Sequence, residues 1–78
     1  MTLLHLACDS PGEEALRILT ENGALTDARD EHSRTPLHLA AKYPDLVRIL
    51  ILLAHGGTID ARDNDSHTSL HVAAMFNN

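Results

Sequence analysis

The clearest regularity in the chain is a pattern of apolar and polar positions that repeats every 33 residues. The six residues from Thr2 read Thr-Leu-Leu-His-Leu-Ala, those from Thr35 read Thr-Pro-Leu-His-Leu-Ala, and those from Thr68 read Thr-Ser-Leu-His-Val-Ala. Aligned without a gap, residues 2–34 and 35–67 share 14 identities over 33 positions. The chain is therefore built from a duplicated unit, and a period of this length is typical of stacked repeat proteins.

Each unit predicts two short helices followed by a polar loop. In the second unit, Thr35 suits the cap of the first helix and Pro36 suits its first position, while Pro44 is expected to end that helix. A mostly apolar second helix is predicted from about 46 to 55, and Gly56 with its neighbouring glycine would terminate it.

The first unit follows the same plan, with helices predicted near 3–9 and 13–21 and a loop from 24 to 34. The stretch 58–67 is the matching loop of the second unit, because it is polar and rich in turn-forming residues. The fold class is therefore an all-α repeat. We predict a single domain over residues 1–78, with repeat 1 at 2–34, repeat 2 at 35–67 and a partial repeat 3 at 68–78.

Small residues occupy the positions where stacked helix pairs would approach closely. Alanine recurs at one such position in all three units, and Cys8 stands where the other units have Ala41 and Ala74. A small thiol in an alanine position predicts a buried structural cysteine rather than a reactive one.

The 33-residue period, with units that open Thr-Pro-Leu-His-x-Ala-Ala as at 35–41, resembles the ankyrin repeat. The helix stop at 23–24 and the paired Asp-Ala-Arg-Asp loops at 27–30 and 60–63 strengthen a resemblance that covers residues 2–78. The resemblance implies an ankyrin-type helix-turn-helix solenoid with β-hairpin or loop fingers. In that architecture the fingers and first helices line a concave groove that binds a partner protein.

The same resemblance implies structural roles for the threonine and histidine of each opening motif. Their hydrogen bonds would tie neighbouring loops and helices together, and the residues concerned are Thr35 with His38 and Thr68 with His71. Some ankyrin repeats are hydroxylated on an asparagine of the finger loop. Aspartate stands at that position here, as Asp27 and Asp60, which fits such a modification less well.

Several positions depart from the usual ankyrin pattern. Prolines stand where a glycine usually joins the two helices, serines replace the finger glycine, and two units lack the opening proline. The residues concerned are Pro11, Pro44, Ser33, Ser66, Leu3 and Ser69. Neither end carries the polar capping repeat that keeps such stacks soluble. We therefore expect a fragment or truncated product of a longer array. It should be marginal in stability or self-associate through exposed helix faces, in particular the region 46–53, or through its uncapped ends.

Composition narrows the partner. The 78 residues carry a formal net charge of −5, with eleven acidic against six basic residues, which argues against nucleic acid. The longest apolar run, 49–54, is far shorter than the roughly 20 residues that span a bilayer, so no membrane contact is expected. With no signal peptide and a single cysteine, the chain is expected to be intracellular, in the cytoplasm or nucleus.

Six histidines invite a metal hypothesis, but their spacing opposes it. His5, His38 and His71 are equivalent residues of stacked helices, which lie about 8–10 Å apart. Two imidazoles on one zinc ion must each bring a nitrogen to about 2.0–2.1 Å, so equivalent positions cannot share a metal. His32 and His55 fall in loops or at helix ends. No catalytic motif accompanies them, so we expect no enzyme activity, no metal and no cofactor.

The two aromatic residues, Tyr43 and Phe76, are 33 residues apart and therefore stand at equivalent positions at the end of the first helix. Aromatic side chains are effective interface anchors, so we predict that both face the partner. An alternative is that they only cover the stack locally. The remaining predicted contacts are Lys42 and Met75 beside them, and the finger residues Arg29, Glu31, His32, Arg34, Arg62, Asn64, Asp65 and His67.

These features predict a protein–protein interaction module. The alternative is a structural spacer within a longer ankyrin array, which has no partner of its own and would tolerate scrambling of residues 29–34 and 62–67.

Overall fold

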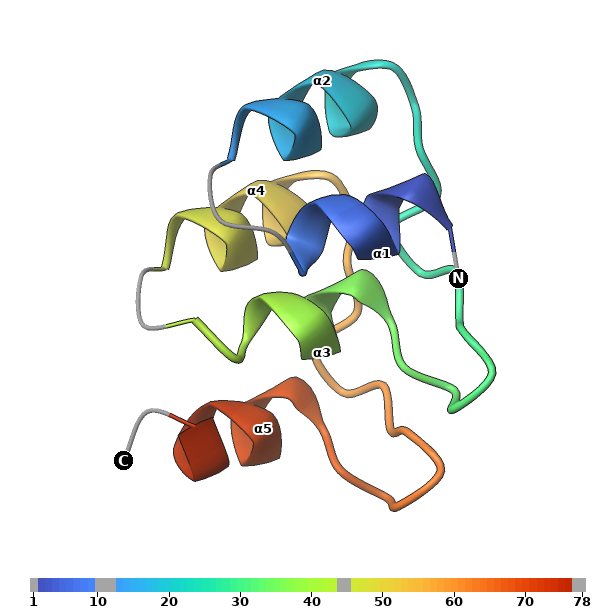
Figure 1. The fold of residues 1–78 in the computed structure, drawn as a ribbon, viewed down its shortest axis with the longest axis vertical. Helices are drawn as coiled ribbons and strands as arrows, with labels where there is room; N and C mark the ends of the chain where they lie inside the picture. Colours follow the sequence, from blue (N-terminus) through green and yellow to red (C-terminus); the bar gives the residue numbers. More distant parts are fainter. Residues whose placement is uncertain (1, 10–12, 44–45, 77–78) are drawn as a thin grey trace.

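Five short helices make up the regular structure of this computed structural model, which describes residues 2–9, 13–43 and 46–76 (Figure 1). They are α1 (Leu3–Cys8), α2 (Glu14–Glu21), α3 (Pro36–Ala40), α4 (Val47–Ala54) and α5 (Ser69–Phe76). The described residues contain no strand, so the predicted fingers are loops rather than β-hairpins. None of these helices is long enough to cross a bilayer.

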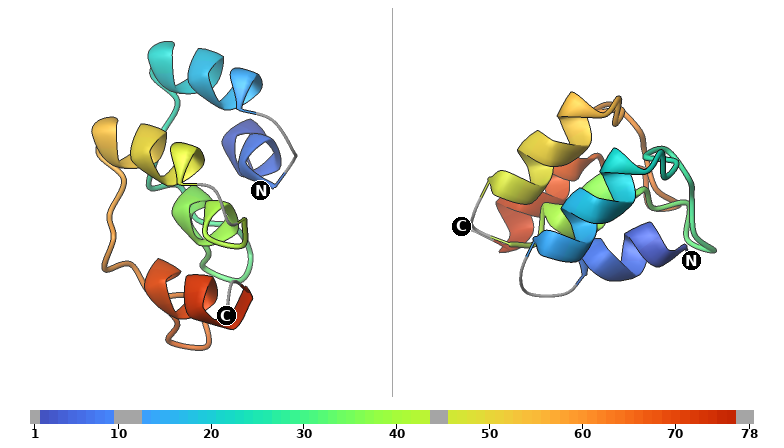
Figure 2. Two further views of the ribbon diagram at one scale, coloured as in Figure 1. Left: turned by 90° about the vertical axis from the view of Figure 1, so that its left-hand side faces the viewer. Right: turned by 90° about the horizontal axis from the view of Figure 1, so that it is seen from above.

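The helices form two layers. Helices α1, α3 and α5 stack in one row, and α2 and α4 form a second row beside them (Figure 2). Two loops, finger 1 (residues 24–34) and finger 2 (residues 58–67), lie on the same side of the stack in Figure 1. The three Leu-His stretches therefore begin successive helices of one row. The predicted all-α repeat solenoid is confirmed.

The predicted helix limits agree with the observed ones to within a residue or two, except at the end of α3. That helix ends at Ala40, before the proline predicted to end it, and Pro11 and Pro44 both lie outside the described residues. The N–H of Lys42 bonds to the carbonyl of Leu39 at 3.3 Å, a three-residue spacing that tightens the last turn. The α-helix therefore ends in a narrower turn after Ala40.

Left-handed backbone marks the predicted helix stops and finger turns. Gly23 and Gly56 have φ of 85° and 93°, which glycine adopts without strain. Ser33 and Ser66 have φ of 61° and 64°, at the positions where serine replaces the usual finger glycine. The backbone of the finger is thus that of a glycine turn, although a side chain is present.

The core lies between the two layers. Leu4, Leu16, Leu37, Leu39 and Leu52 are almost completely buried there, together with Cys8 and Ala40. Burial, the largest effect, raises the pKa of the Cys8 thiol to about 12. The cysteine is therefore a small neutral core side chain at neutral pH, as its alanine-like position predicts.

Candidate partner-binding groove

The position of each finger is set by a histidine at the start of a first helix. The Nδ1 atom of His38 accepts a hydrogen bond from the N–H of Thr35 at 3.1 Å and lies 2.9 Å from its hydroxyl oxygen. Because Nδ1 accepts, the proton of the neutral ring is on Nε2, which donates to the carbonyl of His67 at 2.7 Å. His38 thereby connects α3 to the end of finger 2.

The first unit repeats this connection, and the third unit has only half of it. His5 bonds to Thr2 through Nδ1 and to the carbonyl of Arg34 through Nε2 at 2.8 Å. His71 keeps its 2.8 Å contact with Thr68, but no acceptor for its Nε2 is found within the described part of the chain. His71 is also exposed, whereas the other two histidines are buried.

An aspartate closes the turn of each finger. Oδ1 of Asp30 accepts from the N–H groups of His32 and Arg34, each at 2.9 Å, and Oδ2 accepts from Nε of Arg34 at 2.8 Å. Burial pushes the pKa of Asp30 up, but these hydrogen bonds and the Arg34 charge outweigh it, so the pKa lies below its ordinary value. Asp63 closes finger 2 with bonds from the N–H groups of His67 and Asp65, and these bonds, with the nearby His67 and His38 rings, outweigh burial and lower its pKa.

The two fingers are joined by hydrogen bonds. The Arg29 guanidinium donates to the carbonyl of Arg62 at 2.6 Å, and the Asn64 N–H donates to the carbonyl of His32 at 3.0 Å. At the base of the fingers, the Asp27 carboxylate accepts from the N–H of Thr58 at 2.9 Å. Two polar side chains in this region, those of Arg29 and Asp27, therefore already hold one unit to the next.

A groove of about 380 Å³ opens between the fingers and the first helices α3 and α5. Eight of the twelve residues predicted to contact a partner line it, and four others, Arg29, Glu31, Arg62 and Tyr43, do not. The eight are His32, Arg34, Lys42, Asn64, Asp65, His67, Met75 and Phe76, and the lining is completed by His38, Leu39, Asp63 and Val72.

The predicted aromatic pair is in two different environments. Met75 and Phe76 are largely exposed beside the groove. Tyr43 is half-buried, its hydroxyl donates to the carbonyl of Asp9 at 2.7 Å, and its ring lies 4.4 Å from the guanidinium carbon of Arg48. The observed contacts of Tyr43 are therefore with its own stack.

Two neighbouring cations, Lys42 and Arg48, lie beside Tyr43 in the stack, and no equivalent pair lies beside Phe76 among the described residues. Lys42 forms an ion pair with Asp9, which holds the ends of α1 and α3 together. Arg48 is buried under the Tyr43 ring and was not predicted to have a role. It is the only charged residue of α4, and that isolation in an apolar helix was the signal in the sequence.

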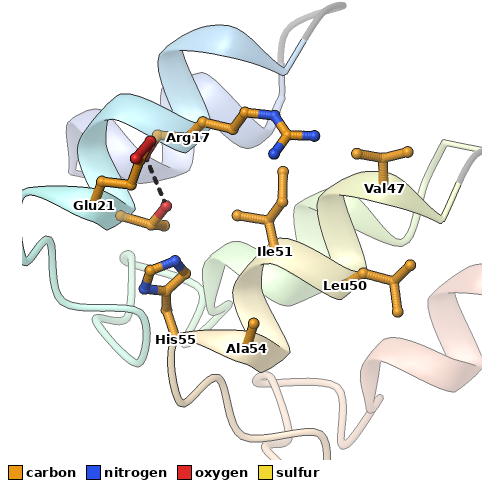
Figure 3. Close-up of a pocket in the computed structure, with 8 residues that line it drawn as sticks. Arg17, Glu21, Val47, Leu50, Ile51, Ala54 and His55 are labelled. Atoms are coloured by element: carbon orange, nitrogen blue, oxygen red, sulfur yellow. Dashed lines mark hydrogen bonds between the residues drawn. The ribbon is translucent and has the colours of Figure 1, made fainter.

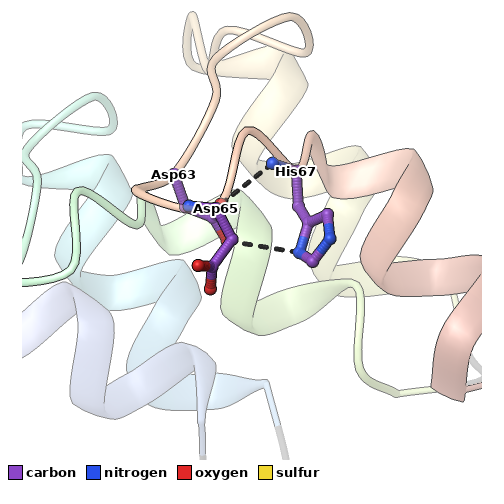
Figure 4. Close-up of side chains that lie close together, drawn as sticks. All are labelled: Asp63, Asp65 and His67. Carbon is purple, nitrogen blue, oxygen red and sulfur yellow. Dashed lines mark hydrogen bonds and ion pairs between the residues drawn. The ribbon is translucent and has the colours of Figure 1, made fainter.

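Finger 2 also brings together Asp63, Asp65 and His67, whose potential ligand atoms all lie within 4.8 Å of one another (Figure 4). The turn accounts for this proximity. Asp63 accepts from the N–H groups of Asp65 and His67, each at 2.9 Å, and its carboxylate lies 3.9 Å from the His67 ring. The three side chains form an acidic wall of the groove.

A second pocket, of about 590 Å³, lies on the opposite side of the molecule between α2 and α4. Val47 and Ile51 of α4 face Arg17 and Glu21 of α2 across it (Figure 3). Leu50 also lines it and is exposed where the first unit has Arg17. In the sequence analysis, only the predicted self-association through the region 46–53 concerned this surface.

Comparison with protein families agrees with this arrangement of stacked helices and fingers. A family model described as ankyrin repeats (3 copies) matches residues 4–78. The chain belongs to the ankyrin repeat family, whose members are generally protein–protein interaction modules and are typically non-enzymatic. A search of curated proteins gave no match.

Proposed function

We propose that this chain binds a partner protein in the groove between the fingers and the first helices, without catalysing a reaction. The observation that supports this most directly is that eight predicted contact residues line one groove. They combine two exposed apolar side chains, Met75 and Phe76, with polar finger residues of both charges, which is the composition of an interface with an anchor and a polar rim.

The proposal is tested by selecting peptides from a displayed random library on the wild-type chain and measuring their affinities by fluorescence anisotropy. We expect Phe76→Ala and Met75→Ala each to weaken binding by about 10-fold, the effect of removing an interface anchor. Leu25→Ala is the matched control, because Leu25 is an exposed apolar residue outside the groove lining. It should change affinity by less than about 2-fold.

Two results would count against the groove. Either the selected peptides bind both groove variants as tightly as the wild type, or the control loses as much affinity as they do.

The spacer alternative is favoured by a separate observation. Arg29 and Asn64, two of the predicted contact residues, join finger 1 to finger 2, Arg29 through its guanidinium and Asn64 through its backbone N–H. A spacer needs such bonds and no others. Under this alternative, Arg29→Ala would lower the urea midpoint of unfolding while the selection would yield no peptide that distinguishes Phe76→Ala from the wild type.

A further inference from the structure

Three positions on the second helices are charged in the first unit and apolar in the second. The residues concerned, each pair 33 positions apart, are Glu14, Arg17 and Glu21 of α2 and Val47, Leu50 and Ala54 of α4. The apolar residues form one side of the hollow of about 590 Å³ between these helices, and Arg17 and Glu21 lie on its other side (Figure 3). An apolar wall therefore faces a charged wall across the hollow.

These positions lie on the outer side of the stack, where a neighbouring unit does not cover them. The three charged residues of α2 are all exposed, although α4 packs beside α2. Leu50 is 61% exposed at the position equivalent to Arg17, and Ala54 is exposed at the position equivalent to Glu21. A further unit beside α4 would therefore leave both residues open to water. We call Arg17, Glu21, Leu50 and Ala54 the outer face.

The outer face lacks charge on its α4 side. Arg48 is the only charged residue of α4, and it is buried. On the α2 side, Arg17 pairs with Glu13 of its own helix at 3.2 Å while more than half of its side chain is exposed, and no ion pair of Glu21 is found among the described residues. Apolar surface rimmed by polar residues is typical of an interaction site. The rim of this one offers a positive and a negative charge, one helical turn apart, to whatever covers the leucine.

We propose that a second copy of this chain binds the outer face, with the two copies related by a two-fold axis that runs parallel to the row of units. Such an axis sets α2 against α2 of the second copy and α4 against α4, each pair antiparallel, so that residue i faces residue j and j faces i. Because α2 and α4 are equivalent helices that run side by side (Figure 2), one axis brings Arg17 opposite Glu21 of the second copy and Leu50 opposite Ala54.

The outer face is complementary to itself in this arrangement. The spacing of four residues is the same from 17 to 21 and from 50 to 54, so opposite charges meet at α2 in the register in which a large side chain meets a small one at α4. An axis along the helices would instead set α2 against α4 and bury Arg17 and Glu21 against apolar side chains, which is unfavourable. The partner-binding groove lies on the opposite side of the molecule and stays open, so this proposal does not depend on the proposed function.

Sedimentation equilibrium of the full chain, from about 10 µM to about 1 mM, covers the weak association expected of a contact between two pairs of short helices. We expect the wild-type mass to rise from 8.5 kDa and to level off at twice that value. Leu50→Asp should weaken dimerisation at least about 10-fold. Arg17→Glu alone and Glu21→Arg alone should each weaken it by about 10-fold, because like charges then meet at both contacts between the α2 helices.

A mixture of the two charge variants tests the register of the two copies. In a dimer of one Arg17→Glu chain and one Glu21→Arg chain, opposite charges meet at both contacts, so the mixture should dimerise as tightly as the wild type. Leu70→Asp is the matched control, because Leu70 is a leucine of similar exposure outside the outer face, and it should dimerise as the wild type does.

Circular dichroism checks that each variant is folded. The proposal is overturned if the wild type stays monomeric, if Leu50→Asp dimerises as tightly as the wild type, or if the mixture of charge variants associates no better than either variant alone. Loss of dimerisation in Leu70→Asp would also overturn it, because the copies would then meet through another surface.

Discussion

Replacing His38 by alanine should destabilise the fold far more than the same change at His71, although both histidines belong to the same motif. His38 is buried and contacts three groups, the N–H and hydroxyl of Thr35 and the carbonyl of His67. His71 is exposed, and within the described residues its ring forms hydrogen bonds only with the two groups of Thr68, while it lies 5.9 Å from the His67 ring. The comparison therefore isolates burial and the bond to the finger.

The magnitude follows from hydrogen-bond energetics. Each intramolecular bond contributes about 1 kcal/mol net, and a buried polar group left without a partner costs about 1–3 kcal/mol. For His38→Ala, the two lost bonds and the stranded N–H of Thr35 bring the total to about 3 kcal/mol, whereas the carbonyl of His67 keeps its bond from the N–H of Asp63. For His71→Ala, water replaces the lost contacts, and the expected loss is about 0.5–1 kcal/mol. At about 0.05–0.15 kcal/mol per residue, the larger loss is a substantial part of the stability of so small a domain.

Urea unfolding followed by circular dichroism measures both losses. With a slope of about 1 kcal/mol per molar urea, His38→Ala should lower the midpoint by roughly 3 M or leave the chain unfolded in water, and His71→Ala by less than about 1 M. Equal shifts for the two variants would refute the reasoning, because the bond between α3 and finger 2 would then contribute nothing.

Three further outcomes are expected. Asp30 and Asp63 have lowered pKa values, so their stabilisation is complete above the ordinary value of 3.8 and is lost progressively as the pH falls below it. Urea midpoints should therefore show Asp30→Asn less stable than the wild type at pH 6, with a difference that shrinks steadily as the pH falls below 3.8. Cys8, with a pKa raised from 9.0 to about 12, should react with iodoacetamide at pH 8 about 1000-fold more slowly in the folded chain than in urea, and equal rates would show that it is not buried. Ser33→Gly should raise the unfolding free energy by up to about 1 kcal/mol, because glycine adopts the left-handed backbone without strain, whereas a destabilised variant would show that the serine side chain matters more.

The repeat period was sufficient to predict the fold, because it states which residues are equivalent and therefore which faces meet. Gly23 and Gly56 end helices as their position predicts, and Cys8 is buried in its alanine-like position. The end of α3 was predicted less closely, since a tighter turn follows Ala40 and the proline predicted to end the helix lies outside the described residues.

The groove was less predictable, because the repeat period does not indicate which side chains already form contacts within the stack. Tyr43 and Phe76 are equivalent in sequence, but only Tyr43 carries a hydroxyl group. Its hydroxyl donates to the backbone carbonyl of Asp9, which Phe76 cannot do because it has no hydroxyl, and its ring covers Arg48, whose equivalent in the first unit is Ala15. The spacing of the aromatic residues therefore predicts where they lie in the unit, but not whether they are free to contact a partner.

Comparing equivalent residues of the three units also distinguishes the stacking faces from the groove. A side chain that is exposed in one unit and buried in the others, such as Leu70 or Leu6, lies on a stacking face, since the neighbouring unit accounts for the difference. The apolar residues Met75 and Phe76 replace Lys42 and Tyr43 of the preceding unit, both of which bond to Asp9. Met75 and Phe76 therefore differ from Lys42 and Tyr43 in residue type as well as in exposure. Because units that only stack need no such change, the substitution favours a contact that the third unit makes outside the stack.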